Sequence, residues 1–307
     1  MITYLKNEKG FRPIEEWVPN CWINVECPTE NEVALLSEKF NIPSEFISDI
    51  ADTDERPRSE VDDDYQYLII RIPHFSDNGA PYITVPLGII FSNDVILTLC
   101  YYQTQMLADF TVYTQRKNIN VANNFDFVMR LILSSSIWFL KYLKQINNQI
   151  RQAEIELERS IKNKELQSLM SIEKSLVYFI TSLRGNGILF SKTKNLKFSK
   201  EFFDEDLYED AEIELRQAIE TATIYSNILS GIRDSYASVI SNNLNVIIKQ
   251  LTSISIILMM PTVIASIFGM NIPNFLEHND FAFMWVILGS FLISIVSVLL
   301  FKRRDWF

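Results

Sequence analysis

The sequence predicts an α+β protein with an N-terminal mixed α/β domain, a long helical hairpin, a stalk helix and two C-terminal membrane-spanning helices. Short apolar runs separated by turn residues fill residues 1–124, as in a compact domain of many short elements. No proline occurs between Pro86 and Pro261, and this absence predicts unusually long helices. Two apolar runs without a charged side chain follow, and each is long enough to cross a bilayer.

The α/β domain, residues 1–124, is predicted to be cytoplasmic. Local signals mark the ends of its elements: Pro28-Thr29-Glu30 and Pro43-Ser44-Glu45 are each predicted to open a helix, and Ser76–Gly79 is predicted to form a hairpin turn. Runs rich in Ile, Val, Leu and Tyr predict strands at Cys21–Val25, Tyr67–Ile72, Ile83–Phe91 and Val95–Cys100.

Residues 125–202 predict a cytoplasmic helical hairpin. Apolar residues recur at helical spacing from Phe125, and Lys141–Lys164 is polar on its other faces, as expected for one arm of an antiparallel pair. The second arm, Glu165–Arg184, is predicted to end at Gly185-Asn186-Gly187, because glycine commonly follows a helix C-terminus. The basic segment Lys192–Lys200 is predicted to be a connection.

A third long helix is predicted to begin near Phe203–Asp206, where acidic residues suit a helix N-terminus. It forms the stalk, residues 203–250, and is expected to continue into the first span. A helix of this length needs neighbours, and copies of itself around a symmetry axis supply them most economically.

The C-terminal region predicts a membrane hairpin. Buried core helices are the alternative, but such helices seldom stay uncharged on every face. Lys249 precedes the first span and Lys302-Arg303-Arg304 follows the second, whereas the loop between them has no Lys or Arg. The positive-inside rule then predicts a multi-pass protein of the cell membrane with both termini in the cytoplasm. The expected parts are a first span at 251–270, an external loop at 271–280, a second span at 281–301 and a basic cytoplasmic tail at 302–307.

Composition excludes several classes of function. The formal net charge of −10 argues against a nucleic-acid partner and is compatible with the attraction of cations. No glycine-rich phosphate loop occurs, so nucleotide binding is not supported. Only two histidines occur, His74 and His278, and the second lies across the predicted membrane from every cysteine, which disfavours an enzyme. The three cysteines lack C-x-x-C spacing and suit a reducing compartment.

Polar and small side chains recur along one face of the stalk's end and the first span, mostly at steps of three or four residues. A period near 3.5 indicates left-handed supercoiling around a centre, so we interpret this face as a pore lining. Ile248 and Leu251 at its edge are predicted to form an apolar constriction that gates by dewetting. Alternatively, the hydroxyls bond carbonyls of the preceding turn or pack against another span. The members of this polar face are Asn242, Asn245, Thr252, Ser255, Met259, Thr262 and Ser266.

No acidic residue lies on the polar face. Rings of carboxylates would bind a divalent cation tightly and release it slowly, whereas hydroxyls, amides and carbonyls suit an ion that keeps part of its water. Mg²⁺ dehydrates reluctantly, so the lining favours the passage of hydrated divalent cations.

The tripeptide Gly269-Met270-Asn271 between two C-terminal spans resembles the CorA family of magnesium transporters. The basic tail with Trp306 strengthens the resemblance, which extends over nearly the whole chain. Further matching segments are Arg56–Glu60, Tyr65–Ile70, Ser241–Asn245 and Pro261-Thr262.

The resemblance implies a homopentameric funnel in which five first spans surround one pore for Mg²⁺, with Co²⁺ and Ni²⁺ as further cargo. Gly269, Met270 and Asn271 would lie at the outer mouth, where the asparagine side chain and loop carbonyls meet the hydrated ion. The positions of Asn245, Leu251, Met259 and Thr262 match pore-lining positions of the family. Independently, a chain leaving a helix often needs a left-handed residue, which Gly269 would supply.

The resemblance also implies regulation by cytoplasmic divalent ions, bound by carboxylates between protomers, that hold the channel closed. The candidate ligands are Asp206, Glu209 and Asp210, with Asp62 and Asp64 as partners. A solvated acidic face with a helix cap is the alternative interpretation of these residues.

Two departures from the family pattern bear on ion preference: Ile272–Glu277 replaces an acidic loop, and Leu244 stands where the family has threonine. A ZntB-like zinc transporter on the same scaffold is therefore the competing function. A membrane-anchored sensor that does not conduct is the other alternative, but it would need neither the polar face nor the Gly-Met-Asn mouth.

Overall fold

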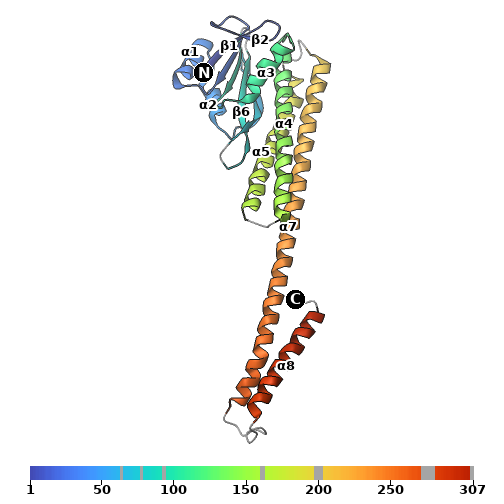
Figure 1. Cartoon of the computed structure of the whole chain (residues 1–307). Coiled ribbons are helices and arrows are strands. Elements are labelled where there is room, and N and C mark those ends of the chain that lie inside the picture. Colours follow the sequence, from blue (N-terminus) through green and yellow to red (C-terminus); the bar gives the residue numbers. More distant parts are fainter. Residues whose placement is uncertain are drawn as a thin grey trace. The chain divides into compact units, whose positions relative to one another are not determined.

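The computed structural model describes residues 1–62, 65–76, 79–91, 95–159, 163–196, 203–270 and 281–304. Within this part of the chain, two compact units are distinguished, Met1–Ser230 and Gly231–Phe307. Figure 1 labels their helices and strands along the chain.

The first unit contains a seven-stranded mixed sheet with the strand order β2-β1-β3-β7-β6-β5-β4. The β3–β7 pair is parallel, and the other neighbouring strands pair antiparallel. The strands are β1 (Ile2–Asn7), β2 (Phe11–Ile14), β3 (Trp22–Glu26), β4 (Arg58–Asp62), β5 (Tyr65–Phe75), β6 (Tyr82–Phe91) and β7 (Ile96–Cys100).

The four predicted strands are confirmed as β3, β5, β6 and β7. The sequence interpretation missed β1, β2 and β4, which lie toward the two edges of the sheet. Strands at an edge carry charged and proline residues, and β2 with Arg12 and Pro13 is an example. The predicted turn at Ser76–Gly79 lies between the paired strands β5 and β6, but residues 77–78 are outside the described part.

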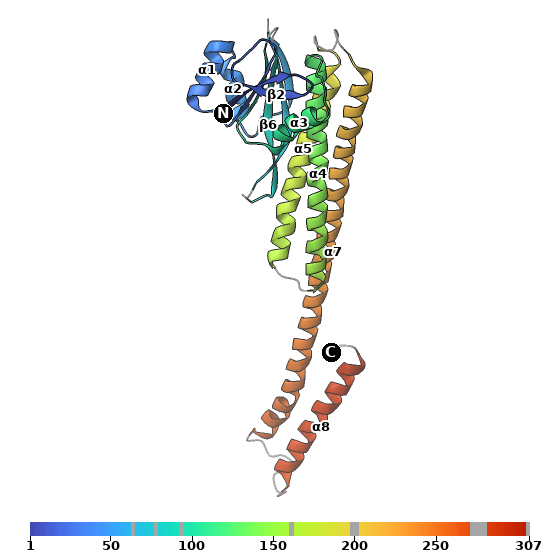
Figure 2. The same ribbon diagram turned by 45° about the horizontal axis from the view of Figure 1, so that its top comes forward.

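Two short helices, α1 (Glu30–Phe40) and α2 (Ser44–Ala51), cover one face of the sheet, as Figure 2 shows. Both begin where the sequence predicts. Thr29 caps α1 in a capping box with Glu32, which satisfies two backbone N–H groups at the helix start. Apolar side chains of both helices join the inner sheet residues in one core, which contains Leu36, Phe40, Phe46, Ile47, Ile50, Ile23, Ile69 and Leu97.

The opposite face of the sheet is covered by α3 (Gln105–Arg116), α4 (Asn124–Arg159) and α5 (Asn163–Thr193). Trp22 lies at the centre of this layer, fully buried, and its indole N–H donates to the Thr98 hydroxyl at 2.8 Å. The rings of Phe11, Phe110 and Phe127 surround it, with centroids 4.9 to 5.7 Å away. The helix α3 was not predicted.

The predicted end of the second hairpin arm is wrong, because α5 continues through Gly185-Asn186-Gly187 to Thr193. Gly185 serves a close approach: a Cβ there would lie 2.9 Å from Cγ of Pro57. Asn186 is buried and bonds the backbone of β5. Both residues therefore serve tertiary contacts within a continuing helix. The first two residues of the predicted connection Lys192–Lys200 belong to α5, which ends at Thr193. Its residues 197–200 are outside the described part.

The helix α7 (Glu205–Phe268) begins as predicted, with the Asp204 carboxylate accepting from the Leu207 N–H at 3.1 Å. Up to Ser230 it lies along α4 and α5 in both views (Figures 1 and 2). Tyr208 stacks on Phe190 of α5 at 4.4 Å between ring centroids. The chain's own hairpin thus covers one face of this part, where the buried residues are Leu207, Tyr208, Ala211, Leu215, Ala218, Ala222 and Leu229.

The second unit contains the remainder of α7, from Gly231, and α8 (Ala282–Arg303). Both α7 and α8 contain a window apolar and long enough to cross a membrane, with mean hydropathies of 2.1 and 2.5. The two apolar runs noted in the sequence lie in these helices. The predicted external loop, 271–280, and residues 305–307 of the tail are outside the described part.

Candidate functional site

Within the second unit, α8 runs beside the end of α7. Ser253 of α7 is fully buried, and Ile256, Ile257 and Ile264 are half-buried at helical spacing. On α8 the half-buried residues also recur every three or four positions: Ala282, Val286, Ser290, Ser294 and Ser297. These matching patterns define one face of each helix as the seam between them.

Most of the predicted pore-lining residues lie on the other side of α7, whereas Asn245 and Thr252 lie about a quarter turn from Ser253. An α-helix turns about 100° per residue, so residues two places from Ser253 or nine places from it fall on the face opposite the seam. In the single chain every one of these side chains is exposed, and Leu251 and Met259 are each 64% exposed. The exposed set is Asn245, Ile248, Leu251, Thr252, Ser255, Met259, Thr262 and Ser266.

Hydroxyls on this polar face donate to the preceding turn. Ser255 donates to the Leu251 carbonyl at 2.9 Å, and Thr262 donates to the Leu258 carbonyl at 3.0 Å. A hydroxyl carries one proton and two lone pairs, so these bonds use the donor and leave the oxygen able to accept. The local bonding expected as an alternative is present, and it orients oxygen lone pairs outward from the helix. Such a surface suits water or a hydrated cation.

Pro261 lies within α7 beside Thr262. Proline has no N–H, so the carbonyl four residues earlier, that of Ile257, receives no helical hydrogen bond from it. This carbonyl lies on the seam side of α7, away from the polar face.

The described part of the predicted mouth, Gly269 and Met270, continues the hydrogen bonding of α7. Gly269 N–H donates to the Ala265 carbonyl at 2.9 Å, and Met270 N–H donates to the Ile267 carbonyl at 3.4 Å. The expectation that Gly269 is left-handed is wrong, because positive φ angles among the described glycines occur at Gly10 and Gly79. Glycine instead avoids crowding, since a Cβ at 269 would lie 3.1 Å from the Ala265 carbonyl oxygen. Asn271 lies outside the described residues.

Comparison with known proteins identifies the family. The sequence profile of the CorA-like Mg²⁺ transporter protein family matches residues 19–303. The chain belongs to this family. The cobalt/magnesium transport protein CorA of Methanocaldococcus jannaschii is 25% identical over 291 residues, which cover 93% of this chain and 90% of that protein.

Solved structures of CorA-like proteins share the fold. The complete CorA magnesium transporter of Methanocaldococcus jannaschii superposes with a TM-score of 0.83 at 22% identity, covering 100% of this chain and 98% of that one. The ZntB cytoplasmic domain of Vibrio parahaemolyticus gives a TM-score of 0.62 at 13% identity, covering 79% of this chain and 98% of that one. The predicted fold class is confirmed: a mixed α/β domain, long helices and two C-terminal apolar helices, as in CorA.

The acidic residues predicted to bind regulatory ions in this CorA-family chain lie only partly within the described residues. Asp206, Glu209 and Asp210 are exposed on the first turns of α7. Asp62 ends β4, but its side chain and the whole of Asp64 are outside the described residues. Among the residues that the structure describes, no group of three or more His, Cys, Asp or Glu side chains is placed to hold a metal ion.

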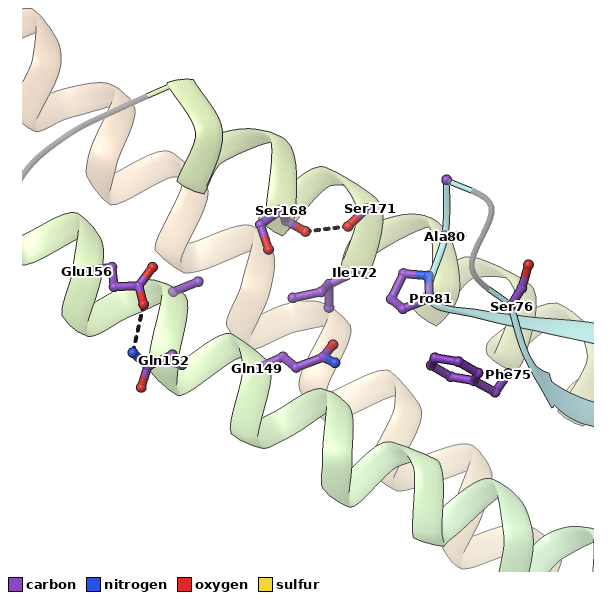
Figure 3. Close-up of a pocket in the computed structure, with 12 residues that line it drawn as sticks. Phe75, Ser76, Ala80, Pro81, Gln149, Gln152, Glu156, Ser168, Ser171 and Ile172 are labelled. Carbon is purple, nitrogen blue, oxygen red and sulfur yellow. Dashed lines mark hydrogen bonds between the residues drawn. The ribbon is translucent and has the colours of Figure 1, made fainter. Parts of the chain in front are cut away.

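A cavity of about 530 Å³, which the sequence did not indicate, lies between the β5–β6 hairpin and the arms α4 and α5 (Figure 3). Gln152 donates to the Glu156 carboxylate at 2.7 Å, and the Ser171 hydroxyl donates to the Ser168 carbonyl at 2.7 Å. Glu156 is the one charged side chain among the described residues that line it. A single carboxylate among otherwise neutral lining residues offers weak means of binding Mg²⁺.

Proposed function

We propose that this chain assembles, as the CorA resemblance implies, into a homopentamer that conducts partly hydrated Mg²⁺ down its electrochemical gradient across the cell membrane. The observation that carries the proposal is the exposed polar face of α7, which lies opposite its seam with α8. Lipid gives no reason to keep hydroxyls at Ser255 and Thr262 on an uncovered face, whereas a water-filled axis does.

The chemistry of this face supports Mg²⁺ as cargo. Hydroxyl and amide oxygens contact the water shell of an ion without replacing it, and Mg²⁺ gives up that shell reluctantly. The curated relative from Methanocaldococcus jannaschii is a cobalt/magnesium transport protein, so Co²⁺ is a second expected cargo, with Ni²⁺ as a third. The likeness to ZntB shows the fold alone, and zinc enters as an arm of the test.

Two constrictions divide the proposed path. Ile248 and Leu251, 57% and 64% exposed in the single chain, would close the pore by dewetting when five copies bring them together. Gly269, Met270 and Asn271 would form the outer mouth. Lys249 and the tail with Lys302 lie on the cytoplasmic side in this arrangement, as the positive-inside rule expects, so both termini are cytoplasmic.

Cytoplasmic Mg²⁺ is also the proposed regulator. Asp206, Glu209 and Asp210 of one copy, with Asp62 and Asp64 of a neighbouring copy, would share the ion and hold the pore closed. No catalytic residue is assigned, because transport down a gradient requires no covalent chemistry.

Uptake into liposomes tests the proposal. Liposomes that contain the purified full chain and a magnesium-sensitive dye are expected to take up Mg²⁺, and Asn271→Ala is expected to abolish that uptake. Equal leakage through wild type and Asn271→Ala would reject transport and favour a sensor that does not conduct. The same assay with Zn²⁺ and a pH gradient separates the two transport functions, since faster zinc uptake driven by the gradient would overturn magnesium as the cargo.

A further inference from the structure

Three consecutive residues of α5, Gly185-Asn186-Gly187, contact three separate parts of the first unit, and we call them the α5 joint. Gly185 contacts the loop after α2: a Cβ at this position would lie 2.9 Å from Cγ and 3.0 Å from Cδ of Pro57. Any side chain here would push on a rigid proline ring. The loop can therefore lie against α5 only because residue 185 is glycine.

Asn186 contacts the sheet. Its side-chain N–H donates to the Arg71 carbonyl at 2.7 Å, and its side-chain oxygen accepts from the Arg71 N–H at 2.9 Å. The β4–β5 ladder ends at the pair Arg58↔Ile69, two residues before Arg71. The Asn186 amide thus continues the ladder in place of the missing strand and ties α5 to β5 at two points.

Arg71 extends this tie to the loop Asp52–Pro57. Its guanidinium donates to the carbonyls of Thr53 and Glu55 at 2.6 and 2.9 Å, and to the carbonyl of Thr84 at 2.5 Å. Burial lowers the pKa of Arg71, and the carboxylates of Asp54, Asp52 and Glu55 oppose that shift. The acidic loop and α5 are therefore held by the same residue of β5.

Gly187, on the far side of the joint, contacts α7. A Cβ at residue 187 would lie 3.5 Å from Cδ1 of Ile219, an ordinary van der Waals distance. One turn further along α5, Phe190 stacks on Tyr208 of α7. The helix α7 then continues unbroken to Phe268, through the polar face.

We propose that the α5 joint positions the loop Asp52–Pro57 relative to α7 and so couples the cytoplasmic domain to closure of the pore by Mg²⁺. This inference rests on the proposed function. The loop, the sheet and α7 each contact a different residue of one rigid helical turn, so a displacement of the loop moves α5 against α7. Closely packed elements transmit such shifts, because they have few alternative arrangements.

The two glycines supply a matched pair of variants. Gly185→Ala and Gly187→Ala add the same methyl group to the same helix and gain the same helix propensity, about 1 kcal/mol. Gly185→Ala forces Pro57 and its loop away, whereas Gly187→Ala adds only a normal contact with Ile219. A difference between the two variants therefore reports the loop contact rather than helix stability.

Inside-out membrane patches, in which the bath sets Mg²⁺ at the cytoplasmic face, measure the coupling. Gly185→Ala is expected to raise the Mg²⁺ concentration for half-inhibition of the current at least fivefold, with the current at low Mg²⁺ unchanged. Gly187→Ala is expected to stay within twofold of wild type. A merely structural joint would lower the Tm of Gly185→Ala and leave half-inhibition unmoved, and that result would overturn the inference.

Asn186→Asp keeps the acceptor for the Arg71 N–H and removes the donor to its carbonyl, so it provides a second variant if Gly185→Ala fails to fold. It is also expected to raise half-inhibition at least fivefold, with the exposed Asn227→Asp on α7 as its control. A shift below twofold, an equal shift in the control, or a wild-type current that Mg²⁺ does not inhibit would each reject the coupling. No wild-type current at all would instead reject the proposed function.

Discussion

The two stretches of α7 place their apolar side chains in opposite ways. Before Ser230, the face against the hairpin is buried, and Ala211, Ala218 and Ala222 have no exposed surface. After Gly231, a serine, Ser253, is the fully buried residue, while Leu258 is 67% exposed. One helix therefore changes from a water-soluble pattern to its inverse along its length.

This contrast indicates which residues carry information about function. In the first unit the hydrophobic effect places apolar residues inside, so an exposed polar residue is expected there. In lipid an exposed apolar residue is expected, and an exposed hydroxyl needs an explanation. The polar face of α7 is thus informative only because it lies in the second unit.

The largest loss of stability is expected from replacing Trp22, with Trp285 as the comparison. Trp22→Ala removes a fully buried ring packed among three phenylalanines and should cost about 3–5 kcal/mol of stability. Trp285 of α8 is 62% exposed, so Trp285→Ala should leave the Tm nearly unchanged. Thermal unfolding of the full chain in detergent measures both. Equal losses of Tm would break the contrast between the two units.

A smaller loss is expected from Asn186→Ala. The Arg71 N–H and carbonyl would lose their partners in a partly buried place, at a cost of about 2–4 kcal/mol. Thermal unfolding of the full chain again measures the loss, with Asn227→Ala on the exposed face of α7 as control. A Tm within a degree of the control would mean that water replaces the amide.

Two serines of α7 sharpen the comparison within the second unit. Ser253→Val overfills the seam with α8 and should destabilise the chain by about 1–3 kcal/mol, with uptake per folded protein reduced less than threefold. Ser255→Val should leave the Tm unchanged but reduce Mg²⁺ uptake at least tenfold, because an apolar ring on the polar face favours dewetting. The reverse assignment of the two effects would show that the seam and the pore face are exchanged.

The smallest effect concerns pH and the first unit alone. Burial lowers the pKa of His74 below its usual value, so the unfolded chain takes up the proton first as the pH falls. The stability from neutral His74 is complete above about pH 6.5 and is lost as the pH falls through the folded pKa. The fall in Tm between about pH 7.5 and 5.5 should therefore be smaller in His74→Gln than in wild type. An unchanged pH dependence would contradict this.

Local signals in the sequence were sufficient for much of the fold. Pro28-Thr29-Glu30 marks α1 because a capping box acts within one turn, and the absence of proline before Pro261 marks the continuity of α7 up to that residue. The predicted end of α5 is wrong because Gly185 is required by a close contact with Pro57, a residue far away in the sequence. No local pattern distinguishes a glycine that ends a helix from one that admits a neighbour.

The grouping of the polar face comes from the sequence, and its role as a pore lining stays a prediction. Its period determines which residues share a side, so the sequence alone groups Thr252, Ser255 and Thr262. Ser253 looks similar in sequence, and only its burial assigns it to the seam with α8. The ligand set proposed to need two copies, Asp206 with Asp62, depends on an assembly that one chain does not contain.

Ser255 is expected to face water, whereas its neighbour Ile254, 47% exposed in the single chain, is expected to face lipid. Cysteine at either position, with the exposed Cys27 replaced by serine, can be treated with a membrane-impermeant cationic thiol reagent before Mg²⁺ uptake is measured. The reagent is expected to reduce uptake through Ser255→Cys at least tenfold and to leave uptake through Ile254→Cys unchanged. Block at Ile254→Cys with no effect at Ser255→Cys would contradict it.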